Sequence, residues 1–256
     1  MAQYDRQTMA SRGGAQAAID EGLRTYMLGV YNYMGIALGI TGVVAYFISM
    51  FAATSDPANA VGTLGNGVML TQLGATLYGS PLQWVVMLAP LAFVFALSFG
   101  IHKMQFATAQ LVFWGFSVAM GLSLSSIFLV YTGESIARVF FITAGTFGAM
   151  SLYGYTTKRD LTAWGSFLMM GLIGIILASV VNIFLQSGAL AFAISIIGVL
   201  VFVGLTAYDT QKIKENYYEG DGSETMGKKM LMGALALYLD FINLFLMLLR
   251  LFGNRE

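Results

Sequence analysis

Two aspartates stand out because each lies in a stretch of sequence that is otherwise almost free of charge. Asp240 has about ten uncharged residues on either side. Asp209 directly follows residues 161–208, a run of 48 residues without Asp, Glu, Lys or Arg. A short acidic side chain inside an apolar helix is costly to bury and marks a functional site. These two carboxyl groups are therefore the first residues to consider for chemistry.

The chemistry of such a pair depends on whether the two carboxyl groups meet. Two carboxylates in a low-dielectric site cannot both ionise cheaply, so they share one proton. The pair would then serve as a proton site, a pH sensor or a weak cation site. Ca²⁺ takes roughly six to eight oxygen ligands, of which Asp209 and Asp240 supply at most about four. We therefore expect weak calcium binding, suited to passage rather than storage, with Asn243 and backbone carbonyls as further ligands.

The spacing of charges sets a condition on this pairing. Asp209 lies three residues from Lys212, whereas Asp240 lies eleven from Lys229. At about 1.5 Å per residue, the two aspartates would differ in depth by about 12 Å. They meet only if the first helix continues past Asp209, or if the second begins well before the membrane.

The elements that must position these residues are transmembrane helices. Hydrophobic residues make up 57% of the 256 residues and charged residues 10%, against about 45–50% and 25% in soluble domains. The uncharged runs are long enough for helices that cross a bilayer, and they lack the period-two alternation of a β-barrel. We predict an all-α polytopic membrane protein, with a polar tail at residues 1–24 and a single domain at residues 25–253. Seven spans are expected at about residues 26–53, 82–101, 105–131, 135–157, 161–185, 189–208 and 229–252.

The last span is expected to be the central helix. Gly233, Ala236, Asp240 and Asn243 follow helical i, i+3, i+4 spacing and share one face. Small residues beside a carboxylate indicate that this face is packed. Between the spans, residues 54–80 and 212–227 are predicted to be polar loops. Gly35 and Gly39 form a GxxxG pattern, which favours close helix packing inside the bundle, with a dimer contact as the alternative.

The distribution of Lys and Arg predicts that the N-terminus is cytoplasmic. Before the last span, alternate sides of the membrane hold ten cations against one, and the cation-rich side faces the cytoplasm. Seven crossings place Arg250 and Arg255 outside, which this rule disfavours. A re-entrant last segment would return them, but residues 230–249 are long enough to cross and contain no Pro.

Composition also excludes several function classes. The net charge is zero, with 13 basic and 13 acidic residues, so no basic surface indicates nucleic-acid binding. The chain has no Cys and a single His, His102, which excludes thiol chemistry and a histidine metal site. No cofactor is expected beyond transient Ca²⁺, and the partners are the lipid bilayer, calcium ions or protons.

Two segments around the aspartates resemble the paired C-terminal signatures of the Bax inhibitor (transmembrane Bax-inhibitor motif) family. They are Ala-Tyr-Asp-Thr-Gln-Lys-Ile at residues 207–213 and Leu-Tyr-Leu-Asp-Phe-Ile-Asn-Leu-Phe at residues 237–245. Gly-Leu-Ser-Leu-Ser at residues 121–125 also fits bacterial members. The resemblance covers residues 23–252 and implies a seven-helix protein of the bacterial inner membrane with the last helix central. It further implies a pH-sensitive calcium leak channel gated by Asp209 and Asp240.

Accessory residues are expected around the pair. Some family members have an Arg latch at the cytoplasmic end of the second span, where this chain has His102 and Lys103. Lys103 supplies a cation but not the two-pronged hydrogen bonding of Arg, and His102 could add to a pH response. Tyr208 and Asn243 complete the accessory set.

Two other functions are alternatives. Some bacterial relatives bind and modulate a membrane ATP-dependent protease, for which residues 1–24, expected to be a disordered tail, would be a degradation handle. An intramembrane aspartyl protease also uses two Asp, the first in a Tyr-Asp pair as in Tyr208-Asp209. The second Asp of that class follows Gly, whereas Leu239 precedes Asp240, so we do not expect an enzyme.

Overall fold

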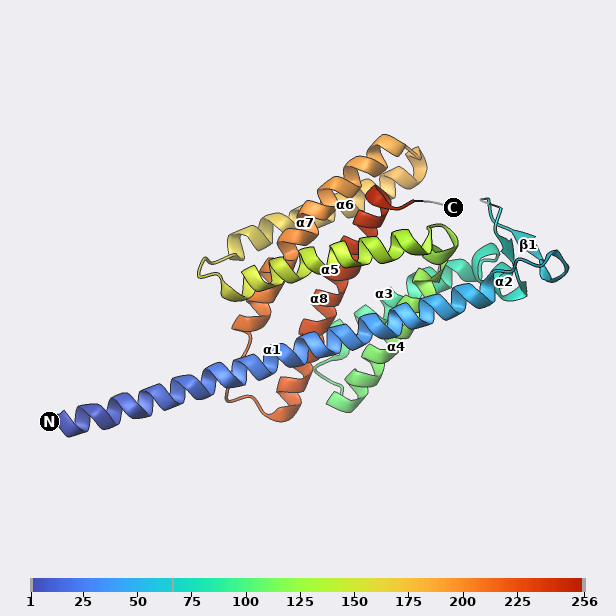
Figure 1. Cartoon of the computed structure of the whole chain (residues 1–256). Helices are drawn as coiled ribbons and strands as arrows, with labels where there is room; N and C mark the ends of the chain where they lie inside the picture. Colours follow the sequence, from blue (N-terminus) through green and yellow to red (C-terminus); the bar gives the residue numbers. More distant parts are fainter. Residues whose placement is uncertain (1, 66, 255–256) are drawn as a thin grey trace.

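The computed structural model describes residues 2–65 and 67–254, with side chains from Glu21 onward. It is a bundle of long helices with a small ordered segment at one end (Figure 1). The elements in chain order are α1 (Ala2–Ala52), η1 (Pro57–Asn59), β1 (Gly62–Thr63), β2 (Met69–Leu70), α2 (Gln72–Gly79), α3 (Leu82–Gly100), α4 (Phe106–Leu124), η2 (Ser125–Leu129), α5 (Gly133–Thr156), α6 (Thr162–Leu185), α7 (Gly188–Glu215) and α8 (Ser223–Phe252).

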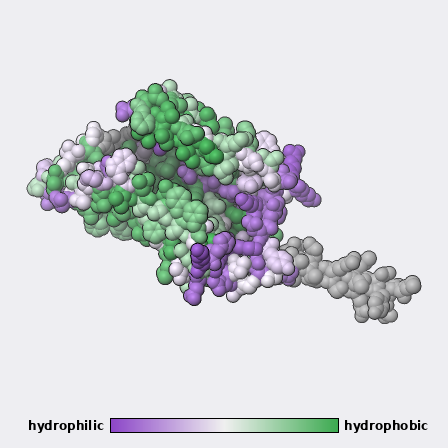
Figure 2. Space-filling model, turned by 180° about the vertical axis from the view of Figure 1, so that it is seen from behind, coloured by the Kyte–Doolittle hydropathy of each residue, from purple (hydrophilic) through white to green (hydrophobic). Residues whose placement is uncertain are grey.

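Seven of these helical segments are long and apolar enough to cross a membrane, which confirms the predicted all-α polytopic class. Large apolar side chains point outward from them, among them Phe99, Leu111 and Phe184, the last 83% exposed. In Figure 2 apolar surface covers most of the helical body, and hydrophilic residues gather mainly at one end. This is the surface expected of a protein whose solvent is lipid.

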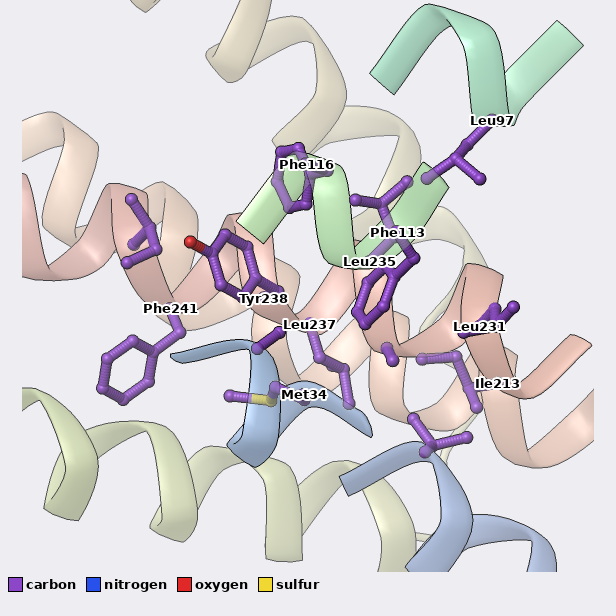
Figure 3. Packing of buried hydrophobic residues seen from close by; sticks show 14 of the residues in the cluster. Met34, Leu97, Phe113, Phe116, Ile213, Leu231, Leu235, Leu237, Tyr238 and Phe241 are labelled. Carbon is purple, nitrogen blue, oxygen red and sulfur yellow. The ribbon is translucent and has the colours of Figure 1, made fainter. Parts of the chain in front are cut away.

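Helix α8 is the central helix, as the sequence predicts. In its most apolar 18-residue window 72% of residues are buried, against 11% in α6. Its side chains pack among residues of α1, α3 and α4, and the ring of Tyr238 lies edge-on to Phe116 with centroids 5.0 Å apart (Figure 3). Lipid is as apolar as these side chains, so close packing and internal hydrogen bonds must hold the bundle together.

The C-terminal end of α8 reaches the opposite end of the bundle from its start. The amide of Thr132 donates to the Asn254 carbonyl at 3.1 Å, and the Asn254 amide donates to Ser135 Oγ at 2.9 Å. Thr132 and Ser135 lie at the start of α5, beside the end where α2 and β1 are found (Figure 1). The last helix therefore crosses the whole bundle and is not re-entrant.

One segment predicted to be irregular is ordered, and one helix begins earlier than its apolar run. Helix α1 begins at Ala2, and the Ala, Gln and Met residues of its first turns are strong helix formers. Residues 54–80 are not a plain loop, because β1 pairs antiparallel with β2 and α2 follows. Thr71 fixes this unit to the bundle, since its amide donates to the Ala52 carbonyl at 3.0 Å and its hydroxyl to the Phe51 carbonyl at 2.7 Å.

The GxxxG pattern in α1 does not mediate packing inside the bundle. Gly35 and Gly39 are exposed, and a Cβ atom added at either would meet nothing within 4 Å. Helix α1 instead turns Met34 and Ala37 to the core. The prediction of internal packing was wrong because larger apolar residues, rather than the glycines, lie on the buried face.

Candidate functional site

The segment between Asp209 and Asp240 is more helical than the sequence predicts. Helix α7 continues six residues past Asp209 to Glu215, and α8 begins at Ser223, so only residues 216–222 connect them. The predicted polar loop at residues 212–227 was wrong. Lys212 and Lys214 occupy the last turn of α7, where cations stabilise the negative end of the helix dipole.

This extension meets the first of the two alternative conditions for pairing, because α7 continues past Asp209. Further toward the connection, Ile213 of α7 packs against Gly233 of α8, where an added Cβ would lie 3.1 Å from the isoleucine. Glycine at residue 233 thus lets the two helices run close together. On its other side α7 approaches α5 closely, because a Cβ at Gly154 would collide with the Ala207 carbonyl.

The carboxyl groups of Asp209 and Asp240 lie close enough together to interact electrostatically. Asp240 is buried, with 5% of its surface exposed. Its Oδ2 atom has no hydrogen-bond partner among the described residues. An unsatisfied polar atom in a buried site costs about 1–3 kcal/mol, and more when charged. A proton or a bound cation would therefore stabilise the pair.

An open cavity of about 570 Å³ leads to this pair from the connection between α7 and α8. Asp209 lines it, and its wall on α8 extends inward to Ala236, one helical turn before Asp240. The complete lining consists of Tyr26, Ile101, His102, Asp209, Lys212, Ile213, Asn216, Thr225, Lys228, Lys229, Met232, Gly233 and Ala236. Solvent can thus approach Asp209, whereas Asp240 is shielded behind it.

The charges lining the cavity are partly neutralised. Lys228 forms an ion pair with Glu224 at 2.8 Å, and Lys229 with Asp221. Lys229 also donates to the Asn216 carbonyl at 2.9 Å, which closes the α7–α8 connection. Lys212 is left as the cation that attracts Asp209.

The four accessory candidates are placed differently. His102 lines the cavity, but Lys103 is exposed and is not part of the lining. Tyr208 packs against Gly165 of α6, with the Lys212 ammonium 5.7 Å from its ring centre. Asn243 turns back on its own helix, where its Nδ2 donates to the Leu239 carbonyl at 2.8 Å. Among these candidates, His102 alone lines the cavity that leads to the aspartates.

Sequence reasoning did not identify the residues that fix α7. The amide of Leu161 donates to Gln211 Oε1 at 2.8 Å, and Gln211 Nε2 donates to the Arg159 carbonyl at 2.8 Å. Lys214 donates to the Tyr155 carbonyl, also at 2.8 Å. The segment just after Asp209 is therefore tied to the connection between α5 and α6. The side-chain amide of Gln211 was the available signal in the sequence, because an amide buried at a helix end needs hydrogen-bond partners.

A second buried polar group ties α8 to its neighbours. Tyr238 Oη lies 2.7 Å from Thr41 Oγ1, and Thr41 donates to the Ser117 carbonyl at 3.0 Å. Because the single proton of Thr41 goes to Ser117, Tyr238 is the donor to Thr41. These bonds join α8, α1 and α4 two residues before Asp240 in the chain.

The donor set limits the ion that this site could hold. In the described part of the chain no three His, Asp or Glu side chains cluster in a way that could hold a metal. The two carboxyl groups by themselves supply at most about four of the roughly six to eight oxygens that Ca²⁺ takes. The arrangement suits proton exchange or weak, transient cation binding.

Fold and site together define a polytopic helical membrane protein with two neighbouring aspartates, one lining an open cavity and the other buried behind it. The family described as "Inhibitor of apoptosis-promoting Bax1" matches residues 23–256. The chain is 50% identical to "Inner membrane protein YbhL" of Escherichia coli K12 over 237 residues, covering 92% of this chain and 94% of that protein. It is 49% identical to protein RP147 of Rickettsia prowazekii over 237 residues, 93% of this chain and 92% of that one. A Caulobacter vibrioides protein is 46% identical over 256 residues, 99% of this chain and 97% of that one. The chain belongs to the Bax inhibitor family.

Proposed function

We propose that this protein is a pH-sensitive calcium leak channel of the bacterial inner membrane, gated by Asp209 and Asp240. The location follows the similarity to the inner membrane protein of Escherichia coli. The observation that carries the proposal is the proximity of the two carboxyl groups, one lining an open cavity and the other buried with an oxygen unpartnered among the described residues.

The mechanism rests on one shared proton. With that proton present, the two carboxyl groups hydrogen bond to each other and hold α7 against α8. When rising pH removes it, two negative charges remain together in an apolar site. Their repulsion is relieved by a cation, by water from the cavity, or by separation of the helices. Each of these changes opens the region beside α8 to ions.

Calcium is the permeant ion in this proposal and not a resident cofactor. Asp209 meets it first, because it lines the cavity, and Asp240 lies behind. Lys212 next to Asp209 opposes the entry of cations. Weak binding lets the ion leave the site, and the adjacent positive charge slows its entry, so the expected flux is a slow leak.

The test is calcium entry into liposomes that contain the full-length protein, measured between pH 5 and 8. In the wild type we expect the flux to change with pH. Asp240→Asn and Asp209→Asn keep the side-chain shape but abolish the shared proton, so each should lose most of that dependence. Asp160→Asn is the matched control, because Asp160 is exposed in the α5–α6 connection, and it should behave like the wild type. Unchanged pH dependence in both site variants would refute the shared-proton mechanism.

The alternative role, modulation of a membrane ATP-dependent protease, depends on residues 1–24. Side chains up to residue 20 lie outside the described part of the chain, so this role stays a prediction. Co-purification from native membranes of the full chain and of a chain lacking residues 2–20 separates it from ion transport. Loss of a protease partner without loss of calcium flux would show that the two activities are independent.

A further inference from the structure

A second large cavity lies on the side of the bundle, between α1 and α5. Its volume is about 550 Å³, and it is open to the surface. Its walls are mostly apolar, and its lining comprises Arg24, Met27, Leu28, Tyr31, Phe147, Gly148, Ser151, Leu152 and Tyr155. Leu28 and Leu152 at its edge are 52% and 64% exposed, which places the opening on the lipid-facing surface of spanning helices. We call it the α1–α5 groove.

The dimensions of the α1–α5 groove match one acyl chain in one leaflet. On α1 the lining runs from Arg24 to Tyr31, and on α5 from Tyr155 to Phe147. At about 1.5 Å per residue these stretches are about 10 and 12 Å long. One leaflet contributes about half of the ~30 Å hydrocarbon core. The groove therefore extends over most of the apolar depth of a single leaflet.

The charge is concentrated at the mouth of the α1–α5 groove. Arg24 lies at the end nearest the polar tail, and no hydrogen bond or ion pair from the described part of the chain engages it. Glu21, one turn earlier on α1, lines a different cavity. Lys158 and Arg159 directly follow α5 at the same end and are exposed. Basic groups above an apolar slot between helices are the arrangement that binds anionic lipid headgroups.

The floor of the α1–α5 groove is fixed by hydroxyl groups. Tyr31 Oη lies 2.5 Å from Ser151 Oγ, which lies 3.0 Å from Thr210 Oγ1, and Thr210 donates to the Thr206 carbonyl at 2.7 Å. Each hydroxyl has one proton, so Ser151 donates to Thr210 and Tyr31 donates to Ser151. These bonds hold α1, α5 and α7 together along the floor of the groove. The groove is thus preformed and does not need a lipid to open it.

We propose that the α1–α5 groove is a binding site for one anionic phospholipid, with an acyl chain against Phe147 and Gly148 and the phosphate against Arg24. Lipid is the occupant because the groove opens where lipid is the solvent, and the charge of Arg24, which no described residue pairs, is complementary to a phosphate. This site is separate from the carboxyl pair, so it stands or falls independently of the proposed channel.

The test is native mass spectrometry of the full-length protein in detergent, titrated with phosphatidylglycerol or phosphatidylcholine of the same acyl chains. We expect one phosphatidylglycerol to be retained more strongly than phosphatidylcholine. A basic residue near the membrane surface contributes about 1 kcal/mol to anionic lipid binding, so Arg24→Gln should weaken retention about fivefold. Lys103→Gln is the matched control, since Lys103 is exposed but does not line the groove.

A second pair of variants tests the apolar part. A Cβ added at Gly148 or at Gly145 meets nothing within 4 Å, but only Gly148 lines the groove. Gly148→Leu should therefore fill the groove and abolish retention, while Gly145→Leu should leave it unchanged. Equal retention of the two lipids, or equal effects of the two leucines, would overturn the proposal. A protein dimer that Gly148→Leu disrupts, without selective lipid retention, would assign the groove to a second copy of the chain instead.

Discussion

The hydrogen bonds between Tyr238, Thr41 and Ser117 allow a quantitative test of what holds the central helix. Tyr238 and Thr41 are 0% and 4% exposed. Tyr238→Phe removes the donor and leaves Thr41 still bonded to Ser117, so it should lower the free energy of unfolding by about 0.5–1.5 kcal/mol, the net worth of one hydrogen bond. Thr41→Val leaves the Tyr238 hydroxyl buried without a partner and should cost about 1–3 kcal/mol.

The double variant separates the pairwise interaction from the loss of packing. With Phe at residue 238 and Val at residue 41, no hydroxyl is left unsatisfied. The combined loss should therefore be smaller than the sum of the two single losses by about 0.6 kcal/mol, the average found between transmembrane helices, and by at most about 1.7 kcal/mol. The assay is reversible unfolding in mixed micelles, with each variant compared at one detergent composition. Losses that add to within about 0.3 kcal/mol would refute the reasoning.

The same pair predicts an effect on flux. Tyr238 joins α8 to α1 and α4 close to Asp240. Weakening this junction should raise basal calcium entry in liposomes without altering its dependence on pH, because the carboxyl pair is untouched. A variant that changed the pH dependence instead would place Tyr238 in the titrating unit.

Three further predictions concern other parts of the molecule. The chain has no native Cys, so single cysteines can be introduced and labelled from outside with an impermeant thiol reagent. A cysteine in place of Ala58 should react, and one in place of Ser223 should not. The reverse result would invert the topology. Gln211→Leu leaves the buried amide of Leu161 without its acceptor and should lower stability by about 1–3 kcal/mol, measured by thermal unfolding. Gln211→Glu keeps an acceptor and should lose less. Burial raises the pKa of Tyr78, so the difference titration between the wild type and Tyr78→Phe should show a phenolate that forms above pH 10 in the folded protein and near pH 10 once unfolded. The stability that Tyr78 contributes is present below pH 10 and is lost as pH rises through the higher folded value, and a midpoint at the ordinary value would contradict its burial.

The sequence alone determined the class of the protein and the residues of interest. Long uncharged runs leave no alternative to membrane-spanning helices, because every backbone polar group must be satisfied within the helix in lipid. The central place of α8 also followed from sequence, since small residues and a carboxylate on one face must be turned away from lipid. The seven spans, the central last helix and the resemblance to the family all follow from the residues alone.

Tertiary structure decided where those residues lie relative to one another. Whether Asp209 could reach Asp240 depended on how far α7 and α8 continue beyond the apolar runs. A charged helix end such as the turn around Lys212 has the composition of a loop, so the sequence predicted a loop there. The extension is stabilised by contacts that no local pattern reveals, among them the bonds of Gln211 to the α5–α6 connection and the packing of Ile213 on Gly233.

The glycines and hydroxyl groups also show which features the sequence determines and which only the tertiary structure determines. The pattern Gly35–Gly39 suggested packing, yet Gly154 and Gly233, which stand in no such pattern, are where helices approach closely. Tyr31, Ser151 and Thr210 lie on three helices, and only the fold brings their hydroxyl groups into one chain of hydrogen bonds. Hydropathy is a property of each residue and can be read along the chain, but a close approach or a hydrogen bond between helices is a property of two distant residues and is fixed only when the bundle packs.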